Sequence, residues 1–191
     1  MSATADRART GRNDMWKGAL AGLVGGLVAS FVMNRFQELL TAAAVGRSRA
    51  RFHFEQGGQI KKSARHRPWS LEKSESATSK AANALSRLVR GRSLHGRKRQ
   101  RAGRALHYGF GAISGAAYGA LAEHFSSVTV GRGTAFGTLV WLVADEMFVP
   151  VAGLSKSPDK YPGSAHAQSL AAHLVYGATT EAVRRPVRTA L

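Results

Sequence analysis

The chain has 191 residues, with 28 Lys and Arg against 11 Asp and Glu, which gives a formal net charge of +17 at pH 7. It contains no cysteine, and this excludes disulfides, thiolate metal sites and cysteine nucleophiles. The positions of the basic residues and of the apolar stretches are more informative than the composition itself.

The N-terminal part predicts a basic tail followed by a membrane anchor. Residues 1–14 are polar and basic, and the stretch from Gly18 to Asn34 then holds 17 residues without a formal charge. A helix that crosses the ~30 Å hydrocarbon core needs ~20 such residues. Because the stretch is too long for a signal sequence and has no clear cleavage site, we expect an uncleaved transmembrane helix at 15–45.

A basic insertion occupies residues 46–104, with 17 Lys and Arg from Arg47 to Arg104. Its first part, up to Ala77, lacks periodic apolar positions, so we expect an extended loop there. Apolar residues then recur at helical spacing and predict a surface helix at about 78–95. A basic cluster runs directly into the next apolar stretch: Arg97, Lys98, Arg99, Arg101 and Arg104.

A basic amphipathic helix beside a membrane crossing is typical of a membrane-surface element. Each juxtamembrane Lys or Arg attracts anionic lipid by ~1 kcal/mol. We therefore expect the basic cluster to contact anionic lipid or an acidic partner protein. Nucleic acid is a third candidate, but only Phe52, Phe54 and Trp69 could stack on bases and no recognised binding motif is present, so we do not expect it.

Three further stretches have nearly the length of a membrane span. Ala105–Ala122 and Gly163–Thr180 each hold 18 residues without a formal charge, and Gly133–Ser155 carries Asp145 and Glu146 near its middle. Together with the first stretch they predict an all-α membrane bundle of about four transmembrane helices, the last three at 105–126, 133–155 and 163–186. The alternative is a soluble helical domain with long apolar core helices. Abundant Gly, Ala and Ser favour the membrane interpretation, because small residues suit close helix contact in lipid.

The chain contains an internal repeat. The six residues from Tyr118 to Glu123 recur 58 positions later as Tyr176 to Glu181, and the segment from Gly18 to Ala29 resembles that from Gly133 to Ala144, 115 positions later. The pattern predicts two tandem helical hairpins of the same orientation. It also marks four repeat-related polar residues: Tyr118, Glu123, Tyr176 and Glu181.

Glycines at intervals of four predict helix-packing stripes. One stripe lies on each of the first two stretches: Gly18, Gly22 and Gly26, and Gly111, Gly115 and Gly119. The stripes fit either packing within one bundle or a homodimer interface, and the sequence leaves both open.

The acidic pair in the third stretch is the main candidate site. A charge at mid-membrane costs at least ~2.5 to 3.5 kcal/mol, so Asp145 or Glu146 should face protein or water. His173 lies near the centre of the fourth stretch, and we expect it to pair with one of them in a site that exchanges a proton near neutral pH. The alternative is a purely structural hydrogen bond.

The basic residues also bear on orientation. The positive-inside rule favours a cytoplasmic insertion with both termini outside, although Arg184, Arg185 and Arg188 oppose that choice.

No constellation of residues predicts a reaction or a cofactor. His107 and His166 sit at similar repeat positions and could ligate haem, but histidines near helix entrances are usually interfacial. Several serines and histidines occur without a nucleophile elbow or phosphate loop. We therefore expect neither an enzyme nor a bound cofactor or metal.

One resemblance extends from Leu106 to Arg185. It rests on a series of residues in order: His107, Tyr118, Ala122, Glu123, Phe125, Gly133, Gly137, Pro150, Gly153, Leu154, Pro158, His173, Leu174, Val175, Glu181, Arg184 and Arg185. In these positions the chain resembles the YagU-like family of bacterial inner-membrane proteins. The resemblance implies a multi-pass protein of the bacterial inner membrane and supplies no reaction, substrate or cofactor. The basic insertion lies outside it and has no counterpart in the family.

Two functional hypotheses follow. The first is a non-enzymatic scaffold or accessory subunit of the membrane, alone, as a homo-oligomer or in a larger complex. The second is a small transporter or proton-handling protein built around Asp145, Glu146 and His173. A cavity that reaches Asp145 would favour the second.

Overall fold

The computed structural model describes the backbone of residues 2–55 and 76–191, and the side chains of residues 14–44 and 76–191. Every regular element in these ranges is helical, which confirms the all-α prediction. The elements are α1 (Ser2–Glu55), α2 (Ala77–Arg90), α3 (Gly96–Ala122), the 3-10 segment η2 (Ser126–Gly133), α4 (Thr134–Val140), the π-helix η3 (Trp141–Phe148), α5 (Val149–Val151), the 3-10 turn η4 (Pro158–Lys160) and α6 (Gly163–Ala190).

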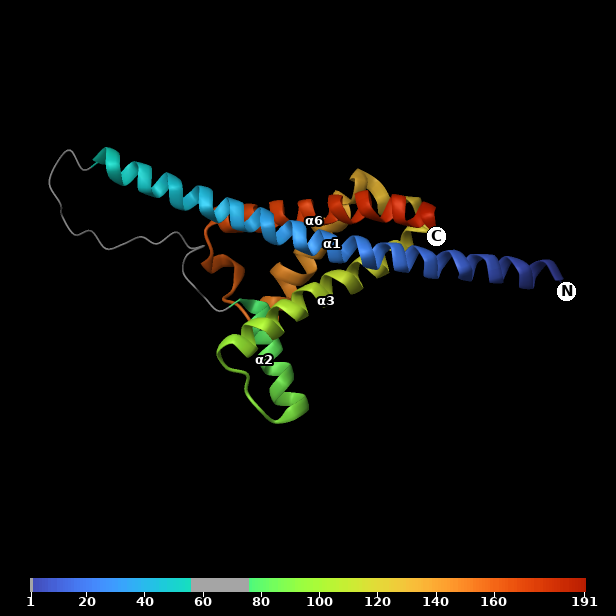
Figure 1. Cartoon of the computed structure of the whole chain (residues 1–191), viewed down its shortest axis with the longest axis horizontal. Coiled ribbons are helices and arrows are strands. Elements are labelled where there is room, and N and C mark those ends of the chain that lie inside the picture. Colours follow the sequence, from blue (N-terminus) through green and yellow to red (C-terminus); the bar gives the residue numbers. More distant parts are fainter. Residues whose placement is uncertain (1, 56–75) are drawn as a thin grey trace.

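The central helix is α1, which packs against α3 on one side and α6 on the other, while α4 packs against α6 (Figure 1). Both α3 and α6 run antiparallel to α1. At one end of the bundle, which we call the terminal end, Lys17 Nζ donates a 2.7 Å hydrogen bond to the carbonyl of Leu191. The opposite end, which we call the α2 end, carries α2 and the first turns of α3 and α6.

The glycine stripes of α1 and α3 face each other within the chain. Gly18 lies against Gly119, Gly22 against Gly115 and Gly26 against Gly111. A β-carbon added at any of the six would collide with backbone atoms or, at Gly111, with the Ser30 side chain. The two backbones are therefore in van der Waals contact, as expected for helices that associate in lipid, and the stripes are occupied inside one molecule.

The second hairpin repeats these contacts. Gly133 of the short helical run before α4 lies against Gly177, and Gly137 lies against the backbone of His173. Under the sequence offsets of 115 and 58, these pairs are equivalent to Gly18 with Gly119 and to Gly22 with Gly115. Equivalent residues thus make equivalent contacts in both hairpins, which supports an origin by duplication.

Two segments are long and apolar enough to cross a membrane, namely Asp14–Ala44 and Ser126–Val151. They overlap the first and third predicted crossings. The second and fourth stretches lie in α3 and α6 but contain many Gly, Ser, Thr and His residues, whose hydropathy is low. The structure therefore suggests a membrane protein, and the bundle of four crossings stays a prediction.

The basic insertion differs from expectation in its first part. α1 continues as far as Glu55, so the chain is helical where an extended loop was predicted from Arg47. The rest of that loop, residues 56–75, lies outside the described residues. The predicted surface helix corresponds to α2, which begins at a Ser76 cap and ends at Gly91 in the left-handed conformation.

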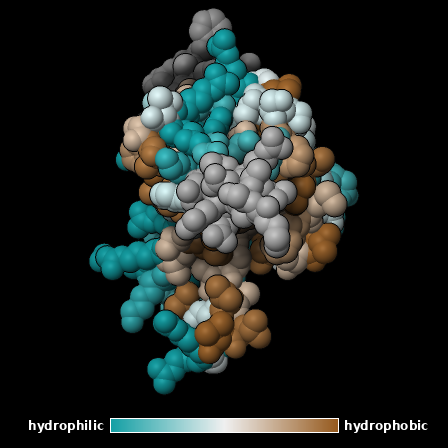
Figure 2. All heavy atoms as spheres, turned by 90° about the vertical axis from the view of Figure 1, so that its right-hand side faces the viewer, coloured by the Kyte–Doolittle hydropathy of each residue, from teal (hydrophilic) through white to brown (hydrophobic). Residues whose placement is uncertain are grey.

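α2 projects from the side of the bundle and runs across its long axis (Figure 1). It packs against the start of α3, where Gly103 lies against Ser79. Its apolar residues Leu85, Leu88 and Val89 are exposed, Leu88 by 85%. Figure 2 shows hydrophobic and hydrophilic side chains next to each other in this part of the molecule, at the bottom of the view.

Candidate functional site

A pocket of about 680 Å³ opens at the α2 end of the bundle. Residues of α1, α2, α3, α4, η3, α5 and α6 line it, and about half of them are apolar. Two of the three predicted site residues, Asp145 and His173, are among them. A cavity therefore reaches the acidic residue, as the proton-handling hypothesis requires.

Asp145 and His173 are joined through Ser169, which the sequence analysis did not single out. The Ser169 hydroxyl donates a 2.6 Å hydrogen bond to Asp145 Oδ2, and His173 Nδ1 lies 3.9 Å from the same oxygen. His173 Nδ1 also lies 2.9 Å from the Ser169 carbonyl oxygen. Because a carbonyl only accepts, Nδ1 carries the hydrogen in this contact, which leaves Nε2 as the acceptor nitrogen of a neutral ring.

Asp145, Ser169 and His173 together form what we call the pocket site. It lies toward the α2 end rather than at the middle of the bundle. Ser169 belongs to the first two turns of α6, and Gln37 and Gln100 line the same pocket. Asp145 is also 40% exposed at its side chain. The depth of Asp145 in a membrane, which the sequence analysis put near the middle of the third crossing, stays a prediction.

Glu146 makes a separate pair. Its Oε1 lies 2.7 Å from His166 Nδ1, and His166 Nε2 lies 3.0 Å from the carbonyl oxygen of Pro158. Both ring nitrogens of His166 are therefore engaged, so this residue is not free to ligate haem with His107. The predicted trio of Asp145, Glu146 and His173 is thus divided between two histidines.

A π-helix presents the two acids. Residues Trp141–Phe148 have the wider π spacing, which is rare and frequently marks functional sites. Asp145 and Glu146 are adjacent in it and project toward different partners on α6, as their neighbouring helical positions require.

The pocket site occupies positions where the first hairpin has small, uncharged residues. Under the repeat offsets, Asp145 corresponds to Ser30, Ser169 to Gly111 and His173 to Gly115. Ser30 lies against Gly111 in the first hairpin, just as Asp145 contacts Ser169 in the second. The same contact geometry therefore carries ionisable groups in one hairpin only.

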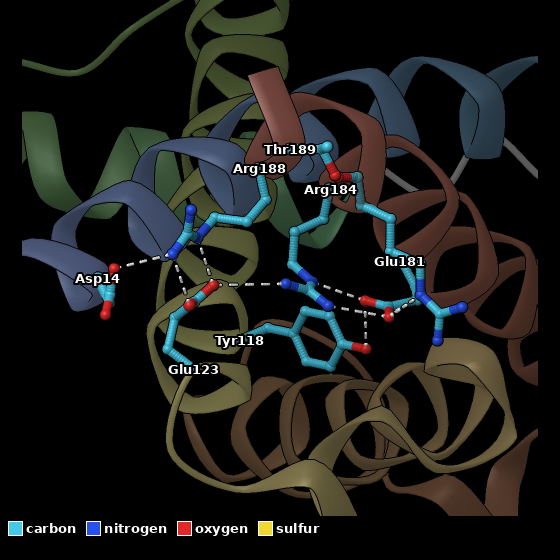
Figure 3. Close-up of polar contacts among 8 residues, drawn as sticks. Asp14, Tyr118, Glu123, Glu181, Arg184, Arg188 and Thr189 are labelled. Carbon is cyan, nitrogen blue, oxygen red and sulfur yellow. Dashed lines mark hydrogen bonds and ion pairs between the residues drawn. The ribbon is translucent and has the colours of Figure 1, made fainter. Parts of the chain in front are cut away.

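A second polar cluster, which we call the terminal cluster, lies near the other end of the bundle (Figure 3). The Glu181 side chain, in a residue that is only 1% exposed, is its centre. Glu181 accepts hydrogen bonds from Arg184 Nε at 2.7 Å and Nη2 at 3.0 Å, from Arg185 Nε at 2.7 Å and from the Tyr118 hydroxyl at 2.8 Å. Arg184 also lies over the Tyr118 ring, 5.8 Å from its centroid.

The rest of the terminal cluster links three helices. Arg188 of α6 donates to Glu123, after α3, at 2.8 and 3.0 Å, and to Asp14 of α1 at 3.1 Å. Arg184 Nη1 lies 3.7 Å from Glu123. The three acids of the terminal cluster therefore balance its three arginines in charge. The hydrogen bond to the Glu123 carboxylate raises the pKa of Arg188 above its ordinary value.

Aromatic rings separate the two clusters. Tyr176 lines the pocket and donates a 2.6 Å hydrogen bond to the Gly111 carbonyl. Phe136 lies between Tyr176 and Tyr118, with ring centroids 5.9 Å and 4.4 Å away. Both repeat tyrosines are almost fully buried. The pocket thus ends at an aromatic layer, with the terminal cluster beyond it.

The remaining predicted residues belong to α3. Arg97, Lys98, Arg99, Arg101 and Arg104 lie on its first turns at the α2 end, and Arg104 lines the pocket. Sequence reasoning missed Ser169 as part of the site, and it did not predict that Arg184 and Arg188 belong to a polar cluster. Their spacing from Glu181 on one helix, three and seven residues, was the available clue.

The described residues form an all-helical protein with a pocket and two apolar helices of membrane length. They contain no cluster of metal ligands. Residues 91–182 match the model of a family described as "Protein of unknown function (DUF1440)". The match covers just under half of the chain and overlaps the region of the YagU-like resemblance. Neither the curated proteins nor the solved structures yielded a match.

Proposed function

We propose that this chain is a multi-pass integral protein of the bacterial inner membrane, crossed by the four helical regions of the bundle, and that it acts as a non-enzymatic scaffold or accessory subunit. The bacterial origin and the inner membrane come from the YagU-like resemblance. The remaining parts of the proposal rest on the surface of the molecule.

The observation that carries the proposal is the exposed apolar surface of the segment Ser126–Val151. Only 6% of its most apolar window is buried, against 39% for the window in α1. Its large side chains Leu139, Val143, Met147 and Val151 are exposed. Exposed apolar surface on this scale is costly in water, and lipid or a partner helix would cover it.

The α2 end supports the same proposal. α2 crosses the bundle axis and so would lie in the plane of a membrane that the bundle spans (Figure 1). Its exposed leucines then enter the interface, and the neighbouring basic cluster meets anionic lipid or an acidic partner. This arrangement favours a cytoplasmic α2 end with both termini outside.

Single-cysteine labelling tests the four crossings, because the native chain has no cysteine. In intact spheroplasts, an impermeant maleimide should label Ser127→Cys and leave His95→Cys protected until the membrane is permeabilised. If only Asp14–Ala44 and Ser126–Val151 cross, positions 95 and 127 lie on the same side and label alike. Release of the parent protein by alkaline carbonate would contradict the membrane location itself.

A second candidate, a proton-handling protein, is favoured by the pocket site. Asp145, Ser169 and His173 form a hydrogen-bonded set that can exchange a proton with the pocket. Since the glycine stripes are used within the molecule, they offer no free interface to a scaffold, and this strengthens the second candidate relative to the sequence analysis.

A further inference from the structure

We propose that the pocket at the α2 end binds one phospholipid molecule, with the phosphate beside Arg104 and an acyl chain along the apolar wall. The inference rests on the membrane location proposed above and adds a specific ligand site to it.

The face of α3 that lines the pocket changes in polarity along its length. Gln100, Arg104 and His107 follow one another at helical spacing, and Phe110 and Gly111 continue the same face inward. A guanidinium provides forked donors that fit a phosphate group. The next turns inward offer an aromatic wall, as an acyl chain requires.

α1 shows the same gradient from the opposite direction. Gln37 and Asn34 line the outer part of the pocket, and Met33 and Ser30 line the inner part. Because α1 and α3 are antiparallel and paired through Gly26 and Gly111, the polar residues of both helices lie at the same end. Polar groups of both helices therefore lie toward the α2 end, and further inward the pocket is lined by apolar side chains together with Asp145 and His173.

Large apolar side chains from outside α1 and α3 also line the pocket. Val140, Phe148, Val149 and Leu154 line it, and Phe148 is 65% exposed although it belongs to the pocket wall. Free inorganic phosphate would leave these surfaces bare. A ligand with a phosphate and a long apolar part covers both regions at once.

His107 supplies an independent sign of a polar ligand group. Its Nε2 is buried and has no hydrogen-bond partner among the described residues. His107 lies three residues, ~4.5 Å along the helix axis, inward from Arg104. The glycerol esters of a phospholipid lie a similar distance inward from the phosphate, so they would lie beside His107.

The position of α2 fits the same ligand. Ser76 to Ser79 and Ala81 line the pocket, and an interfacial α2 would hold the mouth at the depth of the lipid head groups. The occupant is therefore best matched by a lipid entering from the leaflet on the α2 side.

The test uses the full-length protein in liposomes that contain a phospholipid with a photoreactive group in its acyl chain. Labelled peptides should map to the pocket-lining parts of α3 and η3–α5. Arg104→Ala should lower labelling about tenfold, the effect of losing one charge-assisted hydrogen bond. Val149→Trp should lower it similarly by filling the pocket.

Matched controls are Arg101→Ala and Val151→Trp, whose positions are exposed and do not line the pocket. Both should label like the parent, and millimolar inorganic phosphate should not compete. Equal labelling of all four variants would show only surface lipid and overturn the proposal. Labelling that appears only after residues 56–75 are replaced by a Gly-Ser linker would mean that this chain, rather than a lipid, fills the pocket. That result would also overturn the proposal.

Failure of this inference is distinguishable from failure of the membrane location. A protein that resists carbonate extraction but gives equal labelling contradicts the lipid site alone. A protein that carbonate releases contradicts the membrane location and the lipid site together.

Discussion

The Tyr118 hydroxyl donates a 2.8 Å hydrogen bond to Glu181, so that the first residue of one repeat copy binds the last residue of the other. Both residues are 1% exposed. The two hairpins are thus joined by a buried, charge-assisted contact as well as by packing.

Removing this hydroxyl should loosen the hairpins from each other. Tyr118→Phe keeps the stacking on Phe136 and deletes one hydrogen bond to a charged group, a loss of about 1.5–3 kcal/mol. Thermal unfolding in detergent measures the change. Tyr161→Phe is the matched control, since its hydroxyl makes one exposed 3.3 Å contact and should matter little. Equal melting of both variants would contradict the assigned role of Tyr118.

Glu181→Gln should be more damaging than any surface charge change. Its carboxylate balances Arg184 and Arg185, and Arg184 is itself buried. Breaking a buried ion pair costs about 3–5 kcal/mol because the partner charge stays uncompensated. Glu38→Gln is the comparison, because its ion pair with Arg35 is exposed and such pairs contribute about 0–1 kcal/mol. Similar unfolding temperatures for the two variants would mean that the terminal cluster does not stabilise the bundle.

The facing glycine stripes predict opposite effects for two alanine substitutions on α3. Gly115→Ala places a methyl group against the Gly22 carbonyl and the backbone of Gly26, and such overpacking costs about 1–3 kcal/mol. Gly109→Ala meets open space and should be neutral or stabilise by up to about 1 kcal/mol. A Gly115→Ala protein as stable as the parent would show that α1 and α3 are not in backbone contact. Gly115→Leu should be worse still.

Substitutions of Asp145 separate a structural role from a proton-handling role. Asp145→Asn retains an oxygen that accepts the Ser169 hydroxyl but does not titrate, so assembly should persist while any proton flux stops. Asp145→Leu removes the acceptor and should cost about 1–3 kcal/mol. Melting in detergent and decay of a pH gradient in proteoliposomes measure the two effects. Glu146→Gln, which leaves the pocket site intact, should keep the flux; unchanged flux in Asp145→Asn would eliminate the proton-handling candidate.

The sequence predicted those features that depend on one helix at a time. The apolar stretches predicted the helices, the spacing of Gly18 and Gly115 predicted packing faces, and the acid at 145 was expected near His173. Local pattern cannot say which faces meet, however, so the pairing of Glu146 with His166 and the link through Ser169 were missed. Nor did it reveal the helical continuation to Glu55, because polar composition indicated a loop.

The two hairpins also differ in how closely their backbones can approach. In the first hairpin Gly26 lies against Gly111. At the equivalent positions the second hairpin has Trp141 and Ser169, whose side chains are larger. Contact between the second pair of backbones is therefore prevented at this level, next to the pocket. One copy of the duplicated hairpin preserves tight association, and the other has larger residues at the equivalent level, where Asp145 and His173 line the pocket.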